Sequence, residues 1–170
     1  QDSLLYNSTD TSSNFLYDDI IKDASDSINV DISNQKLFLY GNASIKYQGT
    51  TISAGIIEID WSKNTIKARP IIDSLGNMVG YPVFNENGRS FKAERMTYNY
   101  KTKKSFIENI NTKEGEGYIH GQKVKKTEKE IYYINKADYT TCDSDKPHFS
   151  IRSNKVKIIP GKSIVSGPAY

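Results

Sequence analysis

The stretch ISAGIIEIDW at residues 52–61 sets the fold, because its apolar pattern returns in FKAERMTYNY at residues 91–100. Both copies have apolar side chains at the first, third, sixth, eighth and tenth positions. Alternation with a period of two is typical of a β-strand that buries one face. One extra residue after the shared alanine shifts the phase of this alternation. Such a shift is what a β-bulge or a sheet corner requires.

Each copy leads into a polar turn that contains lysine and then into a returning strand. The copies are offset by 91 − 52 = 39 residues, and residues 149–166 resemble a third, weaker copy that turns at Pro160-Gly161. A repeat of this length indicates stacked supersecondary units that bury a shared apolar face. We therefore predict an all-β fold, in which stacked antiparallel hairpins form two facing sheets.

The regular alternation begins at Ser27. We expect a strand at residues 28–32, a second at 37–40 and a third at 43–47. Gly41-Asn42 is expected to separate the second strand from the third. Residues 71–84 are expected to form a hairpin or loop. The apolar residues do not keep a helical spacing over several turns, so we expect no helix beyond a short one near residues 14–22.

The chain of 170 residues fits one domain with a loose tail. Residues 1–26 are rich in Ser, Asp and Asn and are expected to be a flexible polar leader, with the β domain at residues 27–170. The start of the chain lacks the basic and apolar regions of a signal peptide, and no apolar run approaches the ~20 residues that cross a bilayer. The sequence composition leaves the compartment open.

Charge is distributed unevenly. Residues 1–34 carry one Lys and seven Asp, 1 − 7 = −6, whereas residues 101–170 carry fourteen Lys and Arg and eight Asp and Glu, 14 − 8 = +6. The basic half suits either an anionic partner or solvated strand edges. The run at residues 123–126, with tyrosines at 132–133, resembles a phosphate patch, but Glu128 and Glu130 interrupt it. No nucleic-acid-binding motif is present, so no nucleic acid is expected as a partner.

Residues capable of catalysis or metal binding are sparse. Asp143, Asp145 and His148 can in principle ligate a cation, although a solvated turn is the better interpretation. Cys142 with His148 has the residue types of a nucleophile and its base, but no glycine signature for an oxyanion hole accompanies them. A single cysteine also excludes an internal disulfide. We expect a protein that is not an enzyme and that has no metal and no cofactor.

The apolar residues of the alternating strands are candidates for the space between the sheets. They either fill a core or line a trough that holds acyl chains, and the sequence pattern alone leaves both open. The candidate residues are Val30, Leu37, Leu39, Ile45, Ile57, Ile59, Ile66, Met96, Tyr98 and Phe106.

The run LFLYGNASIKYQGTTISAGIIEID at residues 37–60 resembles the OstA-like repeats of lipopolysaccharide-transport proteins, the LptA/LptD family, and residues 91–104 repeat the signature. Residues 137–170 are similar to the segment that precedes the transmembrane barrel in the LptD branch. The resemblance covers residues 28–170, and the abundance of Lys, Asn, Ile and Tyr resembles Bacteroidetes members.

This resemblance implies a β-jellyroll, or β-taco, at the periplasmic face of the cell outer membrane. Such a domain would receive lipopolysaccharide from an LptA-like periplasmic bridge domain through head-to-tail stacking of sheets, and pass it to a C-terminal outer-membrane barrel that is absent from this fragment. Acyl chains would lie between the sheets, with the headgroup outside.

The resemblance also implies a role for Cys142, which occupies the motif of a cysteine that pairs with one in the barrel. This chain keeps only that cysteine, which leaves the pairing open. Two alternatives to the barrel-linked domain are a soluble LptA-like bridge protein and a structural β-domain with a filled core.

Overall fold

The computed structural model describes residues 21–47, 49–86, 88–144 and 147–170. Over this part of the chain the regular structure consists of β-strands, and no helix is long and apolar enough to cross a membrane. The strands are β1 (Ile21–Asp23), β2 (Ser27–Asp31), β3 (Lys36–Tyr47), β4 (Thr50–Asp60), β5 (Thr65–Arg69), β6 (Ile71–Ile72), β7 (Met78–Val79), β8 (Val83–Glu86), β9 (Arg89–Lys92), β10 (Arg95–Asn99), β11 (Lys104–Glu114), β12 (Gly117–Lys126), β13 (Tyr132–Thr140), β14 (Ile151–Ile159) and β15 (Ser163–Ser166).

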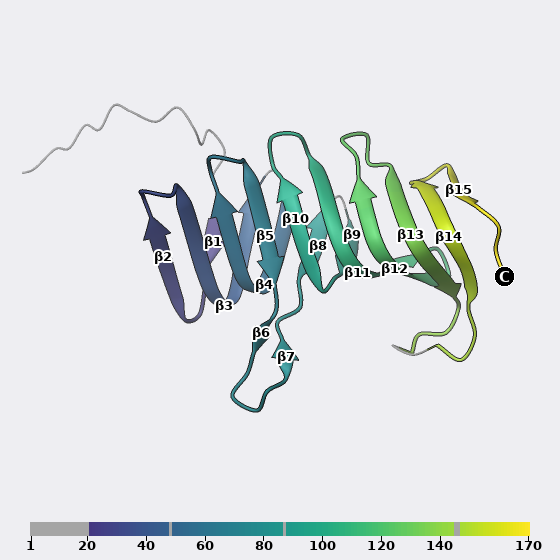
Figure 1. Cartoon of the computed structure of the whole chain (residues 1–170), viewed down its shortest axis with the longest axis horizontal. Helices are drawn as coiled ribbons and strands as arrows, with labels where there is room; N and C mark the ends of the chain where they lie inside the picture. Colours follow the sequence, from purple (N-terminus) through teal and green to yellow (C-terminus); the bar gives the residue numbers. More distant parts are fainter. Residues whose placement is uncertain (1–20, 48, 87, 145–146) are drawn as a thin grey trace, which may run out of the picture.

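Thirteen of these strands form one antiparallel sheet that is folded over on itself into two layers (Figure 1). The front layer contains β2, β5, β10 and β15, and the back layer contains β1, β8 and β9. The long strands β3, β4, β11, β12, β13 and β14 bend at the fold, so each contributes one half to each layer. We call the bend the crease and the opposite, open side, where the hairpin turns lie, the mouth. The predicted all-β class, antiparallel hairpins and two facing sheets are confirmed.

The extra residue that shifts the alternation in each copy of the repeat lies at the crease. In the second copy, Ala93 and Met96 are buried, while Glu94 and Arg95 between them lie on the outside. An extra outward residue lets the chain turn from one layer to the other and still present apolar side chains to the interior. The neighbouring strands β11 and β13 bend at Asn109 and Lys136, which have positive φ angles of 50° and 52°. The predicted sheet corner is therefore confirmed.

Two expectations for the N-terminal part need correction. Gly41-Asn42 does not separate two strands, because β3 continues through it as one bent strand, with positive φ at both residues. Residues 21–26 were assigned to the leader, but β1 pairs with β3 and the backbone N–H of Ser25 donates to Gly41 O at 2.7 Å. The leader's other residues, 1–20, lie outside the described part of the chain, as does most of the conceivable helix.

The hairpin or loop predicted at residues 71–84 is confirmed for residues 71–79 as the hairpin of β6 and β7, which projects from the crease (Figure 1), whereas Val83 and Phe84 belong to β8. Two glycines let the stem of the hairpin lie against β4. Gly55 N donates to Gly80 O at 2.6 Å, and a Cβ on Gly55 would come within 2.8 Å of Ile71 N. Gly80 also has a positive φ of 68°. Any larger side chain at Gly55 would force the hairpin stem away from the crease.

Candidate functional site: the space between the layers

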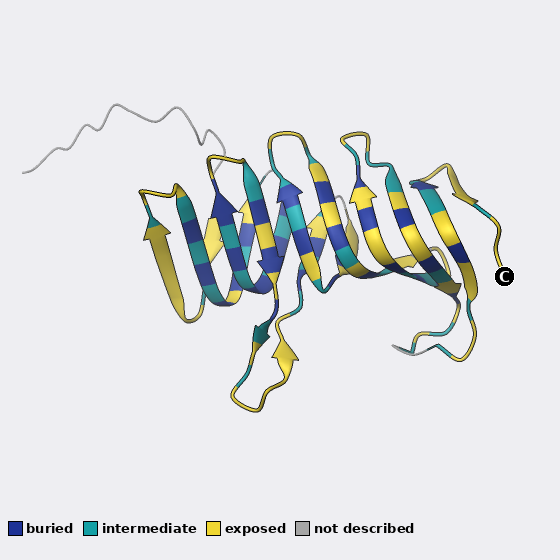
Figure 2. Ribbon diagram, in the orientation of Figure 1, coloured by how far each residue is buried: buried dark blue, intermediate teal, exposed yellow. Residues whose placement is uncertain are grey.

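Most of the predicted interior residues lie on the inner face of the front layer, and Ile45 lies on the inner face of the back layer; buried residues line this interior (Figure 2). Their strands place them there because cross-strand partners share a face. Eight of the ten are buried: Leu37, Leu39, Ile45, Ile57, Ile59, Ile66, Met96 and Tyr98.

The other two residues are exposed, for different reasons. Val30 is 51% exposed, yet it pairs with buried Leu37 and so lies on the interior face, at the open N-terminal end of the front layer. Phe106 is 44% exposed and lies on the outer face, so its interior placement is wrong. Its neighbour Ile107 is fully buried opposite Met96. Two consecutive apolar residues satisfy either phase of the alternation, and the register of β11 selects Ile107.

Aromatic side chains fill the middle of the space. Phe84 and Phe91 of the back layer stack with their ring centroids 4.8 Å apart. The ring of Tyr98 from the front layer meets Phe84 edge-on at 5.8 Å. Sequence analysis missed both phenylalanines as interior candidates, although Phe91 stands at the first position of the repeat. In this region the interior is a packed core.

A polar contact joins the layers beside this aromatic cluster. Glu86 of β8 forms an ion pair with Lys126 of β12, and Thr50 Oγ1 donates to Glu86 Oε1 at 3.1 Å. Lys126 is only 1% exposed, and its ammonium group lies 5.4 Å from the centroid of the Phe84 ring. We call Glu86 and Lys126 the interlayer ion pair. The sequence interpretation that grouped Lys126 with the surface lysines is wrong, since it stands at an inward position of the alternation.

The hydroxyl of Tyr98 is buried in the same region, beside the side chain of Thr50. Burial, and after it the negative charge of Glu86, raises the pKa of Tyr98 to about 12. Nearer the N-terminal end, the Lys103 ammonium group lies 4.9 Å from the ring centroid of Tyr47. Contacts at the mouth thus hold the two layers together over their first half.

Beyond the interlayer ion pair the space opens. A cavity of about 480 Å³ lies between the layers at the mouth. Its walls are mostly apolar, and Arg89 and Lys113 stand at its edge, both exposed. Its apolar walls include Phe91, Ile110, Val124, Tyr132, Ile134, Ile158 and Pro160.

A second apolar hollow, of about 260 Å³, follows at the C-terminal end of the fold. Ile151 and Ile164 in its wall are 56% and 50% exposed. Large aliphatic side chains seldom remain so exposed in a group unless the surface receives something apolar. Together the two hollows extend an apolar interior from the aromatic cluster to the C-terminal edge.

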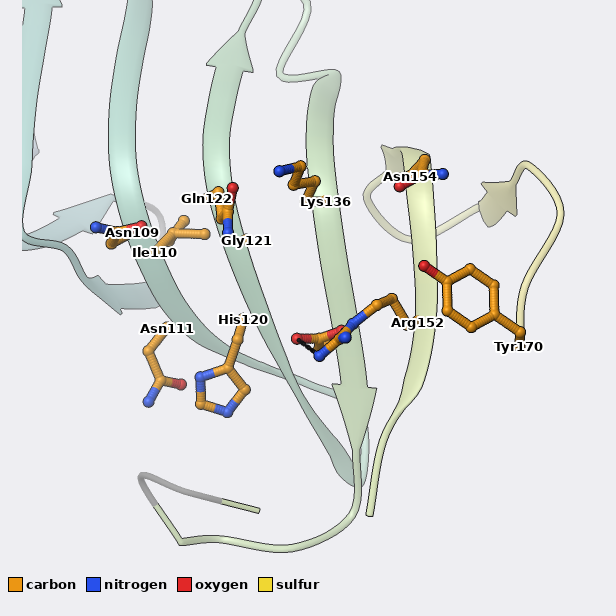
Figure 3. A pocket seen from close by; sticks show the side chains of 11 residues that line it. Asn109, Ile110, Asn111, His120, Gly121, Gln122, Lys136, Arg152, Asn154 and Tyr170 are labelled. Carbon is orange, nitrogen blue, oxygen red and sulfur yellow. Dashed lines mark hydrogen bonds and ion pairs between the residues drawn. The ribbon is translucent and has the colours of Figure 1, made fainter. Parts of the chain in front are cut away.

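A separate groove of about 450 Å³ lies on the outer side of the crease (Figure 3). Its side chains are mostly amides and charged groups, and Arg152 Nε donates to Asp138 Oδ1 at 2.7 Å. Figure 3 shows Gln122, Lys136 and Asn154 projecting from neighbouring strands. Such a lining is unsuited to acyl chains, so the space between the layers remains the candidate for lipid.

The structure brings Cys142 and His148 together, with Sγ 3.5 Å from Nδ1. Backbone N–H groups of Ser144 and His148, together with the His148 ring, lower the pKa of the Cys142 thiol below its ordinary value. Asp145 lies outside the described residues. Within the described ranges no three His, Cys, Asp or Glu side chains form a cluster suited to a metal ion.

Comparison with known proteins points to one family. Over 123 residues, 71% of this chain, the sequence is 26% identical to the LPS-assembly protein LptD of Acinetobacter baumannii, of which the match covers 14%. The fold matches the crystal structure of LptH, the LptA-homologous periplasmic component of the lipopolysaccharide transport device of Pseudomonas aeruginosa, with a TM-score of 0.56 at 14% identity. That match covers 88% of this chain and 96% of LptH. No protein-family profile matches the chain.

Proposed function

We propose that this chain is an OstA-like β-jellyroll domain of the LptA/LptD kind, which receives lipopolysaccharide and passes it to an outer-membrane barrel; its similarity to LptD and the fold it shares with LptH support this. The observation that carries the proposal is the apolar space between the layers, which opens at the mouth and at the C-terminal edge. The chain acts as a carrier and needs no catalytic group, because moving a lipid along an apolar surface breaks no bond.

Acyl chains occupy the cavity beyond the interlayer ion pair. Each methylene that leaves water there contributes about 0.8 kcal/mol. The cavity is open to solvent along the mouth, so a lipid can enter sideways while its polar headgroup stays outside. Among the candidate lipid-binding residues, Leu37, Leu39, Ile45, Ile57, Ile59, Ile66, Met96 and Tyr98 form the closed part of the same interior, and Val30 lies at its N-terminal opening.

Arg89 and Lys113 meet the headgroup. They stand at the edge of the apolar cavity, on β9 and β11 of the back layer. Guanidinium and ammonium groups form charge-assisted hydrogen bonds with phosphate. An apolar wall below two cations is complementary to a phosphorylated lipid, with its acyl chains inward and its phosphate at the mouth.

The two ends of the sheet suit the two partners. At the N-terminal end, β1 and β2 are edge strands, and Ile28 and Val30 of β2 are 54% and 51% exposed. An LptA-like bridge domain adds its sheet here, since an unpaired strand edge is a template for another strand. The domain lies at the periplasmic face of the outer membrane, with the barrel following its C-terminal end, and Cys142 forms its disulfide with the barrel.

Site-specific photocrosslinking tests the carrier role. A benzophenone side chain is placed at Ile110 or Ile134 in the open cavity, and at Thr97 on the outer face as a matched control. With lipopolysaccharide present, we expect crosslinks from Ile110 and Ile134 and none from Thr97. Equal labelling at all three positions, or none at the two interior positions, would overturn the proposal.

The packed aromatic cluster favours one alternative, a structural β-domain with a filled core. That alternative predicts that lipopolysaccharide leaves the melting temperature unchanged. A ligand that binds only the folded state raises the melting temperature with concentration. We therefore expect a concentration-dependent rise, and a smaller rise when Ile134→Trp fills the cavity. As an additional probe, crosslinkers at Ile57 and Met96 report whether lipid also enters the closed part.

A further inference from the structure

The outer face of the front layer carries four lysines in a regular array near its C-terminal end. Lys123 and Lys125 lie on β12, and Lys155 and Lys157 lie on β14, with β13 between them. The register pairs Lys125 with Tyr133 and Tyr133 with Lys157. Strand geometry places the four Cα atoms at the corners of a rectangle of roughly 7 by 10 Å. All four side chains are exposed or half-buried and share one face.

These four lysines have no carboxylate within ion-pair distance among the described residues. On the same outer face nearer the N-terminus, Lys36 and Lys67 both contact Glu58, at 3.1 and 3.6 Å. Four like charges this close repel one another, and an external anion would relieve that repulsion. Glu108 of β11 stands opposite Lys123 in the register, so the face carries one carboxylate beside its four lysines and keeps a positive charge that suits an anionic partner.

Apolar side chains stand in the same array. Phe106 on β11 and Val165 on β15 flank the lysines, and Tyr133 lies among them. Their exposed fractions are 44%, 55% and 45%, and a hollow of about 310 Å³ lies between Phe106 and Tyr133. The Lys157 ammonium group lies 5.7 Å from the ring centroid of Tyr133. We call Phe106, Tyr133, Val165 and the four lysines the basic-aromatic face.

We propose that the basic-aromatic face docks on the surface of an anionic lipid bilayer. Lysines attract an anionic leaflet, and aromatic rings insert at the level of the headgroups. A soluble polyanion would use the lysines but leave Phe106 and Val165 in water. The face is one side of a sheet, and its rings and ammonium groups point the same way, as contact with a membrane plane requires. Docking on this face is independent of the space between the layers.

Binding to lipid vesicles tests this directly. The full chain is floated with vesicles of phosphatidylcholine alone, or of phosphatidylcholine with roughly a third phosphatidylglycerol, near physiological ionic strength. Each lysine near an anionic surface contributes about fivefold to partitioning. Replacing all four with glutamine should weaken binding to the anionic vesicles at least a hundredfold. The matched control replaces Lys22, Lys46, Lys92 and Lys101, which are exposed away from this face and change the net charge equally.

The control variant should bind within a few-fold of the unmodified chain. Equal losses in the two variants, or equal binding to neutral and anionic vesicles, would overturn the proposal. The variant with all four lysines replaced is used only if it unfolds at the same temperature as the unmodified chain. Otherwise the double variant Lys155→Gln with Lys157→Gln takes its place, and its binding to anionic vesicles should weaken at least tenfold.

A fluorescent reporter separates a bilayer from a soluble polyanion. In a Trp61→Phe background, Phe106→Trp carries the chain's single tryptophan. Its emission should shift to shorter wavelength with anionic vesicles and should stay unchanged with inorganic polyphosphate. Phe106→Ser with Tyr133→Ser should weaken vesicle binding at least fivefold. An unshifted emission on vesicles, or full binding by the serine variant, would show a polyanion site and contradict membrane docking.

Discussion

Glu86 of the back layer and Lys126 of the front layer form an ion pair across the mouth of the folded sheet. On its N-terminal side the layers are packed together by aromatic rings, and on its C-terminal side a cavity of about 480 Å³ separates them. The pair thus stands where the closed interior becomes an open one. Its position explains how one continuous sheet contains both a packed core and a lipid-sized space.

Breaking the interlayer ion pair from one side should destabilise the fold strongly. Glu86→Gln leaves the ammonium group of Lys126, which is 1% exposed, without a counter-charge. Such an orphaned charge costs about 3–5 kcal/mol. Replacing both residues, with Glu86→Leu and Lys126→Met, should cost less than the single change. Urea unfolding of the two variants measures the difference, and equal losses would show that the pair does not act as a unit.

Alkaline pH should weaken the fold through Tyr98. Its pKa in the folded chain is about 12, above its ordinary value of 10.0. The folded state therefore holds the phenolic proton more tightly, and this contribution, about 3 kcal/mol, is complete below pH 10 and lost as the pH rises towards 12. Tyr98→Phe has no proton to lose and should show a shallower decline. Urea midpoints from pH 9 to 12 for both chains test this, and parallel curves would contradict it.

Two neighbouring residues on β11 should lose very different amounts of stability on truncation. Ile107 is fully buried between Met96 and Val124, and Ile107→Ala should lower the free energy of unfolding by about 2–4 kcal/mol. Phe106 is 44% exposed on the outer face, and Phe106→Ala should cost less than about 1 kcal/mol. Chemical unfolding of the two variants gives the comparison. A larger loss of stability for Phe106→Ala than for Ile107→Ala would show that Phe106, and not Ile107, lies in the interior.

The thiol of Cys142 should react faster than an ordinary thiol. Backbone N–H groups of Ser144 and His148 and the His148 ring lower its pKa, so more thiolate is present at neutral pH. Its alkylation by iodoacetamide should reach half of its limiting rate at a lower pH than in the urea-unfolded chain, which is the control. His148→Ala should move that midpoint upward. An unchanged midpoint would show that the ring has no influence on the thiol.

Much of the architecture could be predicted from the repeat. The spacing from Ala54 to Ile57, shared by Ala93 and Met96, identified the crease, because an inserted outward residue has one structural consequence in an alternating strand. The hairpin around residue 76 followed from its turn residues in the same way. Local patterns of this kind act over a few residues, and the sequence displays them directly.

The candidate site was harder to predict, because it depends on contacts between distant strands. Lys126 and Glu86 are 40 residues apart, and no local pattern marks them as partners. Phe84 was missed because β8 is only four residues long, too short for a clear alternation. Phe106 was assigned to the wrong face because Ile107 beside it is equally apolar. In each case register, rather than residue type, decides the outcome.

The sequence by itself determined the all-β fold class, the position of the crease and the apolar character of the interior, since hydrophobic periodicity follows from the geometry of a single strand. Only the tertiary structure decided where that interior is closed and where it is open. The aromatic rings of Phe84, Phe91 and Tyr98 and the interlayer ion pair meet from strands that are far apart in the chain. Their packing holds the layers together in one half, and beyond the interlayer ion pair the layers enclose the cavity.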